Sequence, residues 1–197
     1  MGLPGISTTA DPLSWEDATR LYESLIKEEE YRLAAMVIIG MHTGLRISDI
    51  RNLTWRNIIL EDCEIQEHKT GKDKVIYLSP EVKCLLYKCY AKLKTPPLDQ
   101  HFLLSQKKTV YTIQRLNNIM KCWKIKYNLA IKNISTHSLR KTMALRVLTL
   151  YNDDKIKGLK IIQGALNHDR LDDTLRYLGI PLETYTQWEN KGKLICL

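Results

Sequence analysis

The sequence has no apolar run that approaches the roughly 18 residues needed for a membrane-spanning helix. Its N-terminus also lacks the basic segment followed by an apolar one that marks a secretory signal. No internal repeat or low-complexity tract is present, which argues against a solenoid or a disordered chain. We therefore expect a soluble, intracellular protein, and 197 residues are enough for one well-buried domain.

Paired cysteines are also missing. The five cysteines are an odd number, form no CxxC pair and are not followed by histidines at zinc-finger spacing; they are Cys63, Cys84, Cys89, Cys122 and Cys196. Cys84 and Cys89 would lie roughly 140° apart on a helix, which disfavours a shared metal ion. We expect reduced, structural cysteines and no metal site.

Positive charge is abundant. There are 30 Lys and Arg residues against 22 Asp and Glu, which gives a formal net charge of +8 and a pI near 9.2. Such a surface favours a polyanionic partner, because phosphates release counterions when a basic protein binds them. Nucleic acid is the favoured partner, and an anionic membrane surface is the second choice.

The first third of the chain reads as an arm followed by helices. Residues 1–13 hold two prolines and two glycines, which is typical of a linker or flexible arm. A helix is predicted after Ser14, which is followed by an acidic residue at capping-box spacing. A second spans about 31–41 and ends before Gly44, and a third restarts after Arg46.

The middle of the chain changes period once. Residues 58–79 alternate in the manner of strands around the segment KTGKD, which predicts an antiparallel hairpin. Helices are predicted from Pro80 onward, and then over about 112–128, 137–150, 155–166, 170–178 and 182–190. The predicted fold class is mainly α with a small antiparallel β-hairpin (α+β).

Two short motifs favour a phosphate. In TGLRISD, Gly44 permits a tight turn and Arg46 follows at a helix start, where backbone N–H groups are unpaired. Asp49 either holds the guanidinium or simply improves the helix N-terminus, which is the commoner use of an early Asp. In THSLRKT, His137 and Arg140 share one helix face, a pairing that suits proton transfer beside a clamped phosphate or an ordinary solvated basic face.

Two further segments carry reactive side chains. Lys69, Lys72 and Lys74 cluster at the hairpin turn, where exposed lysines are commonly only solvated charge. His168 and Tyr177 lie nine residues apart in NHDRLDDTLRYLG. Taken alone, this pair would be interpreted as a buried histidine and a core tyrosine.

The ordered series of an arginine, a hairpin lysine, His-x-x-Arg, histidine and tyrosine resembles the tyrosine site-specific recombinases of the phage integrase family. The resemblance covers residues from about Ser14 to Ile180. It implies the catalytic-domain fold of that family and DNA cleavage and rejoining through a 3′-phosphotyrosyl intermediate. It also implies that no metal and no nucleotide cofactor takes part.

The resemblance assigns roles to the residues of the N-terminal half. Arg46 matches the first arginine of the phosphate clamp. Asp49 matches the acidic residue that supports it, where relatives more often have glutamate. Lys69 matches the hairpin lysine by its place before the turn glycine, and Lys72 is a weaker claimant.

In the C-terminal half, His137 and Arg140 match the His-x-x-Arg box. His168 takes the place that relatives fill with histidine or tryptophan, although Asn167 before it replaces the usual glycine. Tyr177 matches the nucleophile. A rival tyrosine lies eight residues later in ETYTQW, and further DNA contacts are expected from three basic residues, Lys72, Lys74 and Lys141.

The implied assembly is a homotetramer on double-stranded DNA that is a monomer when free, with an accessory DNA-bending protein as a further partner and no membrane. The location is cytoplasmic and nucleoid-associated, in a bacterium or a phage-borne mobile element. The expected organisation is an arm over 1–13, a catalytic domain over 14–180 and a tail over 181–197. The tail packs either on its own domain or on a neighbouring protomer.

Most members of this family carry an additional N-terminal DNA-clamping domain, so we expect either the catalytic portion of a longer protein or a minimal recombinase. Two other functions remain open. One is a non-catalytic DNA-binding module that uses the basic surface alone. The other is a type IB topoisomerase, which shares the chemistry but relaxes supercoils without pairing sites.

Overall fold

The computed structural model describes residues 10–60 and 63–194. The elements in chain order are α1 Trp15–Lys27, α2 Tyr31–Thr43, α3 Ile47–Ile50, α4 Trp55–Ile59, β1 Cys63–Gln66, β2 Asp73–Ile76, α5 Pro80–Lys92, α6 Ile113–Lys126, α7 Thr136–Leu150, α8 Lys155–Leu166, α9 Leu171–Leu178 and α10 Leu182–Leu194. The predicted fold class, mainly helical with one small antiparallel sheet, is confirmed.

Helix α2 is the centre of the fold. Its residues 33–41 are all buried, and α1, α5 and α7 pack against it. A helix that is apolar on every side is stable only when other elements cover it, which explains this central place. It ends at Gly44, whose φ of 61° lies in the left-handed region. The left-handed backbone at this position favours glycine, and a Cβ there would also contact the Met143 methyl group, which lies at the flexible end of its side chain.

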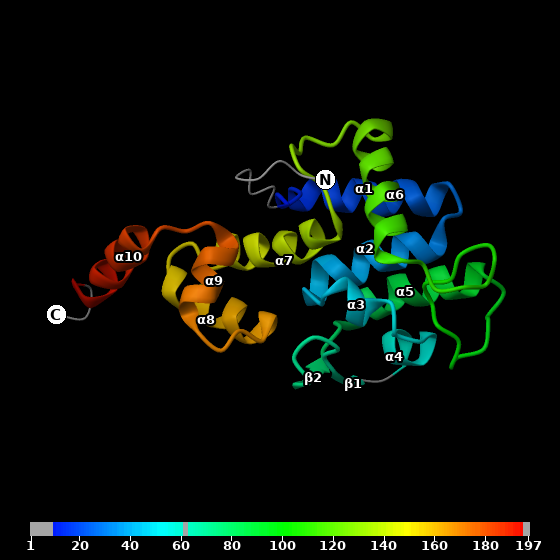
Figure 1. Ribbon diagram of the computed structural model, residues 1–197, viewed down its shortest axis with the longest axis horizontal. Coiled ribbons are helices and arrows are strands. Elements are labelled where there is room, and N and C mark those ends of the chain that lie inside the picture. The colour runs from blue at the N-terminus through cyan, green and yellow to red at the C-terminus, as the bar shows by residue number, and fades with distance from the viewer. Residues whose placement is uncertain (1–9, 61–62, 195–197) are drawn as a thin grey trace.

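The apolar side chains form two separate clusters. The larger one lies among α1 to α6 and the first part of α7. The smaller one centres on Met143, Ala144, Ile162 and Leu166, with Tyr177 packed against it. Figure 1 shows α7 running from the larger body to the group formed by α8, α9 and α10. The predicted nucleophile therefore belongs to a small unit that α7 connects to the main core.

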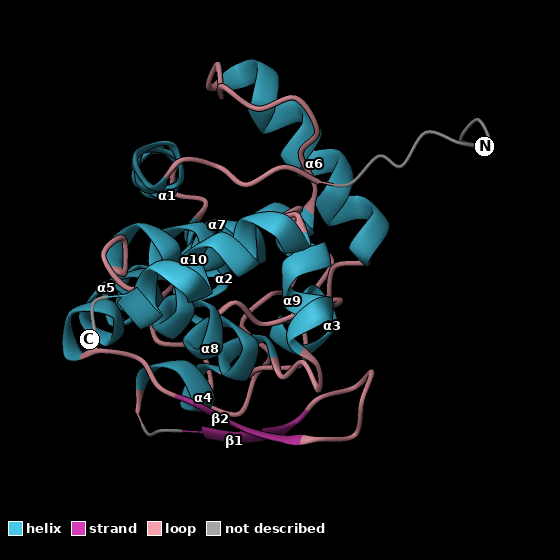
Figure 2. Cartoon of the chain, turned by 90° about the vertical axis from the view of Figure 1, so that its left-hand side faces the viewer, coloured by secondary structure: helices cyan, strands magenta, loops and turns pink. Residues whose placement is uncertain are grey.

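The two strands form the antiparallel hairpin that the sequence predicts, with Ile65 opposite Lys74. Figure 2 shows this hairpin along one edge of the helical body, beside α4. The predicted start of the strand region at residue 58 is wrong, because residues 55–59 form α4. Thr54 and Asn57 make a capping box there, which satisfies the first N–H groups and begins a helix instead.

The segment before α1 is packed where it is described. Leu13 is 1% exposed, and its backbone exchanges hydrogen bonds with the Thr142 hydroxyl on α7. The Asp11 N–H also donates to the Asn133 carbonyl at 2.9 Å. Of the arm expected over 1–13, residues 10–13 therefore lie against the body, and residues 1–9 are outside the described residues.

The described cysteines Cys84, Cys89 and Cys122 are free thiols, whereas Cys196 and the side chain of Cys63 lie outside the described part. Burial raises the pKa of Cys89 to about 11. Within residues 10–60 and 63–194, no helix is long and apolar enough to cross a membrane. In the same range no three His, Cys, Asp or Glu side chains are grouped as metal ligands.

Candidate active site

Arg46 lies at the N-terminal cap of α3, directly after the Gly44 turn. One guanidinium nitrogen donates to Glu67 Oε2 at 2.5 Å, and the Thr70 hydroxyl donates to the same oxygen at 2.8 Å. Burial raises the pKa of Glu67, but the hydrogen bonds from Thr70 and Arg46 and the charges of Arg46 and Lys74 outweigh it and lower the pKa overall. Glu67 therefore stays ionised and orients Arg46.

Asp49 anchors the hairpin. It is 4% exposed, and its Oδ1 accepts the backbone N–H of His68 at 3.0 Å. Glu67, one residue before His68, is thereby held beside Arg46. Asp49 is expected to support Arg46, but in the structure it does so indirectly, by holding the hairpin backbone. Glu67 is the carboxylate that binds the guanidinium. Sequence reasoning missed Glu67, whose only local signal is its place two residues before Lys69.

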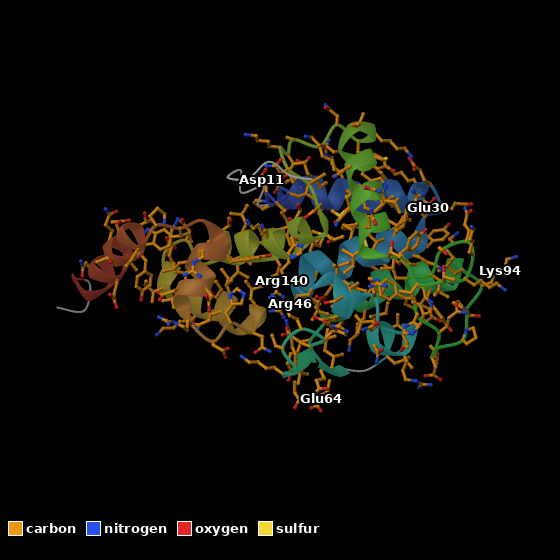
Figure 3. The ribbon with its side chains drawn as sticks, viewed as in Figure 1. Asp11, Glu30, Arg46, Glu64, Lys94 and Arg140 are labelled. Carbon is orange, nitrogen blue, oxygen red and sulfur yellow. The ribbon has the colours of Figure 1, made fainter. Side chains whose placement is uncertain are left out.

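Arg140, on α7, is 3% exposed and contacts both the turn after α2 and the end of α8. Its guanidinium donates to the Gly44 carbonyl after α2 and, at 2.7 Å, to the Leu166 carbonyl at the end of α8. Figure 3 shows Arg140 and Arg46 close together, where the larger body meets the group formed by α8, α9 and α10. Burial, followed by the charge of Arg46, lowers the pKa of Arg140. Two neighbouring guanidinium groups favour an anion that both can bind.

His137 occupies the first turn of α7, which a capping box between Ser135 and Ser138 begins. The residue is exposed overall, but partial desolvation of its ring lowers its pKa, and the charges of Arg140, Lys141, Lys69 and Arg46 lower it further. A neutral imidazole is thus available near pH 7 to accept a proton. Lys69 is exposed on the hairpin turn, and its charge is among those that lower the pKa of His137.

His168 follows α8 through Asn167, which has a φ of 55°. Asparagine tolerates this left-handed conformation, so it can replace the glycine expected there. His168 Nδ1 is 3.0 Å from the hydroxyl of Thr174, a fully buried residue of α9. Burial lowers the pKa of His168, as do the charges of Arg140 and Arg46. Thr174 orients this imidazole, and sequence reasoning missed it because nothing in DDTLRY marks it.

Tyr177 lies on α9, and its ring makes an angle of 75° with the ring of His168, the centroids being 5.7 Å apart. The Arg140 guanidinium carbon is 6.0 Å and Lys141 Nζ 5.3 Å from the ring centroid. The hydroxyl is buried and has no hydrogen-bond partner among the described residues. Burial raises the pKa of Tyr177 to about 12, although the charge of Arg140, the closeness of its guanidinium to the hydroxyl and the charge of Arg46 act in the opposite direction. The rival Tyr185 lies on α10, which packs on α8.

The three lysines expected on DNA all have neighbours within the protein. Lys72 forms an ion pair with Asp169, and Lys74 Nζ donates to the Ala165 carbonyl at 2.5 Å. Burial lowers the pKa of Lys74 to about 8, and the charges of Arg140 and Arg46 contribute. Lys141 lies over the Tyr177 ring.

Residues from four segments that are distant in the sequence thus lie near one another. The family model described as "Phage integrase family" matches residues 13–180 of the chain. The protein belongs to the phage integrase family. This confirms the family inferred from the ordered motifs.

Individual relatives agree with this membership. The chain is 27% identical over 150 residues to the "Probable integrase/recombinase YoeC" of Bacillus subtilis (strain 168), a match covering 76% of this chain and 78% of the relative. Its fold is similar to the crystal structure of XerA recombinase, with a TM-score of 0.69 and 21% identity. That match covers 92% of this chain but 64% of XerA. The lambda integrase catalytic core matches with a TM-score of 0.60 and 18% identity, over 81% of this chain and 92% of the core.

Proposed function

We propose that this integrase domain cleaves one strand of double-stranded DNA through Tyr177 and rejoins it at a specific site. The observation that carries the proposal is that Arg140 and His168 lie beside the ring of Tyr177, whose hydroxyl is buried. The charge of Arg46 acts on Tyr177 and Arg140, and His137 lies among the charges of Arg46 and Arg140. These groups can bind a phosphodiester and move a proton. A relative of the same fold, XerH recombinase, is described as bound to its difH substrate in pre- and post-cleavage complexes.

In the proposed reaction, the Tyr177 oxygen attacks the phosphorus and the bond to the 5′ oxygen breaks. The products are a 3′-phosphotyrosyl link and a free 5′-hydroxyl. Negative charge gathers on the non-bridging oxygens, where Arg46, Arg140 and His168 donate hydrogen bonds. Loss of one such pre-placed donor typically lowers the rate about 100- to 1,000-fold.

Two proton transfers complete this step. A tyrosine whose pKa is raised to about 12 is a weak nucleophile, so its proton must leave as the oxygen attacks. His137, held neutral by partial desolvation and nearby cations, accepts that proton. Lys69 on the hairpin turn donates a proton to the departing 5′ oxygen. Because the phosphotyrosyl link keeps the energy of the phosphodiester, another 5′-hydroxyl can attack it and restore the DNA without ATP.

We infer that recombination requires four copies of the domain on paired DNA sites, in the cytoplasm where chromosomal or mobile-element DNA lies. The C-terminal helix is the segment that can link them. In the single chain α10 packs on α8, with Lys155 Nζ 5.1 Å from the Trp188 ring, while Leu182 remains 61% exposed. Trp188 and Leu182 would contact a neighbouring protomer in the assembly.

A covalent-adduct assay tests the proposal. Duplexes that the protein selects from a random pool are nicked near the cleavage point, so that a short fragment diffuses away and the adduct accumulates on a denaturing gel. We expect an adduct with the wild type and with Tyr185→Phe, and none with Tyr177→Phe. Bound DNA that never yields an adduct would favour the non-catalytic binding module. Relaxation of any plasmid regardless of sequence would favour the topoisomerase function.

A further inference from the structure

The hairpin touches the α8–α9 segment at two points, one on each side of His168. Lys74 of β2 donates to the carbonyl of Ala165 in the last turn of α8, with 2.5 Å between nitrogen and oxygen. Lys72, which precedes β2, is paired with Asp169, the residue directly after His168. These contacts join parts of the chain that are 91 and 97 residues apart.

The same hairpin also makes hydrogen bonds with Arg46 and with α3. Glu67, after β1, holds Arg46, and the N–H of His68 is held by Asp49 of α3. A continuous set of hydrogen bonds therefore runs from α3 through the hairpin to α8. It links the two apolar clusters by a route independent of α7.

Lys74 binds at the end of α8, and this end leads directly to the candidate reactive residues beside the smaller apolar cluster. The carbonyl next to that of Ala165, at Leu166, accepts Arg140, and the turn at Asn167 then leads to His168. Helix α9, which carries Tyr177, makes its main packing contact with α8. A shift at the end of α8 would thus displace His168 and Tyr177 together with respect to the arginines.

Lys74 is poorly suited to a role as a surface DNA contact. Its side chain is partly buried and its ammonium group already has an acceptor. It lies among the charges of Arg140, Arg46, Glu67 and Asp49 rather than in open solvent. An ammonium next to two guanidinium groups costs stability, and such groups cluster at functional sites.

We propose that Lys74 is a positioning residue, which ties the hairpin to the end of α8 and so holds His168 and Tyr177 in line with the two arginines. The Lys72–Asp169 pair makes the same link more weakly, because both side chains are exposed, 37% and 78% respectively, and such pairs contribute little. This inference rests on the proposed strand-cleavage function.

The test separates positioning from DNA contact. Lys74→Met is compared with wild type and with Lys88→Met, a matched loss of one exposed lysine on α5 outside the site. Three quantities are measured for each protein: the dissociation constant for nicked duplex at several salt concentrations, the single-turnover rate of adduct formation at saturating DNA, and the melting temperature.

For Lys74→Met we expect a dissociation constant within about threefold of wild type and a saturating rate about 10- to 100-fold lower, because small misplacements of reacting groups cost about that much. Lys74→Arg keeps a charged donor and restores most of the rate. Asp169→Asn lowers the rate by less than about threefold, in keeping with the weak pair. Lys88→Met behaves as wild type.

Weaker binding with a shallower salt dependence and an unchanged saturating rate would overturn the proposal and make Lys74 a phosphate contact. If Lys74→Met does not fold, Lys74→Gln replaces it, and an unchanged saturating rate in that variant overturns the proposal in the same way. Failure of the underlying function is distinguishable, because the wild type would then form no adduct at all.

Discussion

Replacement of Tyr177 by phenylalanine should remove activity and yet stabilise the protein. The phenolic oxygen is buried and has no hydrogen-bond partner among the described residues. An unsatisfied buried hydroxyl costs about 1–3 kcal/mol, and phenylalanine fills the same space without that cost. Since the side chain is only partly buried, we expect a gain near the lower end, about 1 kcal/mol. For a chain of this size the melting temperature rises by about 2–4 °C.

The assay is paired calorimetry and adduct formation on wild type, Tyr177→Phe and Tyr185→Phe. The Tyr185 variant loses a hydroxyl on α10, so we expect its stability to change by less than about 0.5 kcal/mol and its adduct to persist. Only Tyr177→Phe should combine higher stability with no adduct.

A dependence on pH follows from the same burial. An unfolded tyrosine ionises near pH 10, whereas burial raises the pKa of Tyr177 to about 12. Between these values the unfolded state loses the proton first, so the wild type loses stability with rising pH and Tyr177→Phe does not share that loss. If Tyr177→Phe is instead less stable than wild type, the hydroxyl accepts a hydrogen bond from a neighbouring side chain, with Arg140 as the candidate donor, and the reasoning fails.

Three further effects are expected. Glu67→Gln leaves Arg46 without its buried carboxylate, so adduct formation should fall at least tenfold with a loss of about 1–3 kcal/mol in urea unfolding; unchanged kinetics would show that Arg46 needs no such support. Thr174→Val keeps the shape but removes the contact to His168, and should slow adduct formation about tenfold without weakening DNA binding; an equal loss in binding would contradict this. Desolvation lowers the pKa of both His137 and His168, so NMR titration should place their midpoints below 6.5. The folding stability that these neutral imidazoles contribute should be lost as the pH falls through those midpoints. A midpoint above 6.5 would refute the assigned surroundings.

The helices that the sequence predicts best are those with local signals. Ser14 caps α1 as its spacing to Asp17 indicates, and Gly44 ends α2 in the left-handed conformation. The KTG turn predicts the hairpin, but the predicted start at residue 58 is too early because the capping box at Thr54 begins α4 there. Such signals lie within four residues of the element they control, so a single sequence displays them.

The sequence also supplies the candidate reactive groups and their order along the chain. Arg46, the His137–Arg140 box, His168 and Tyr177 are named through the resemblance to the phage integrase family, and their roles are part of the proposed function. Tertiary structure alone decided what holds each of them: Glu67 for Arg46, two backbone carbonyls for Arg140, and Lys74 for the end of α8. These partners lie 21 to 96 residues away, and no local pattern encodes a contact that forms only when two separately packed apolar clusters meet.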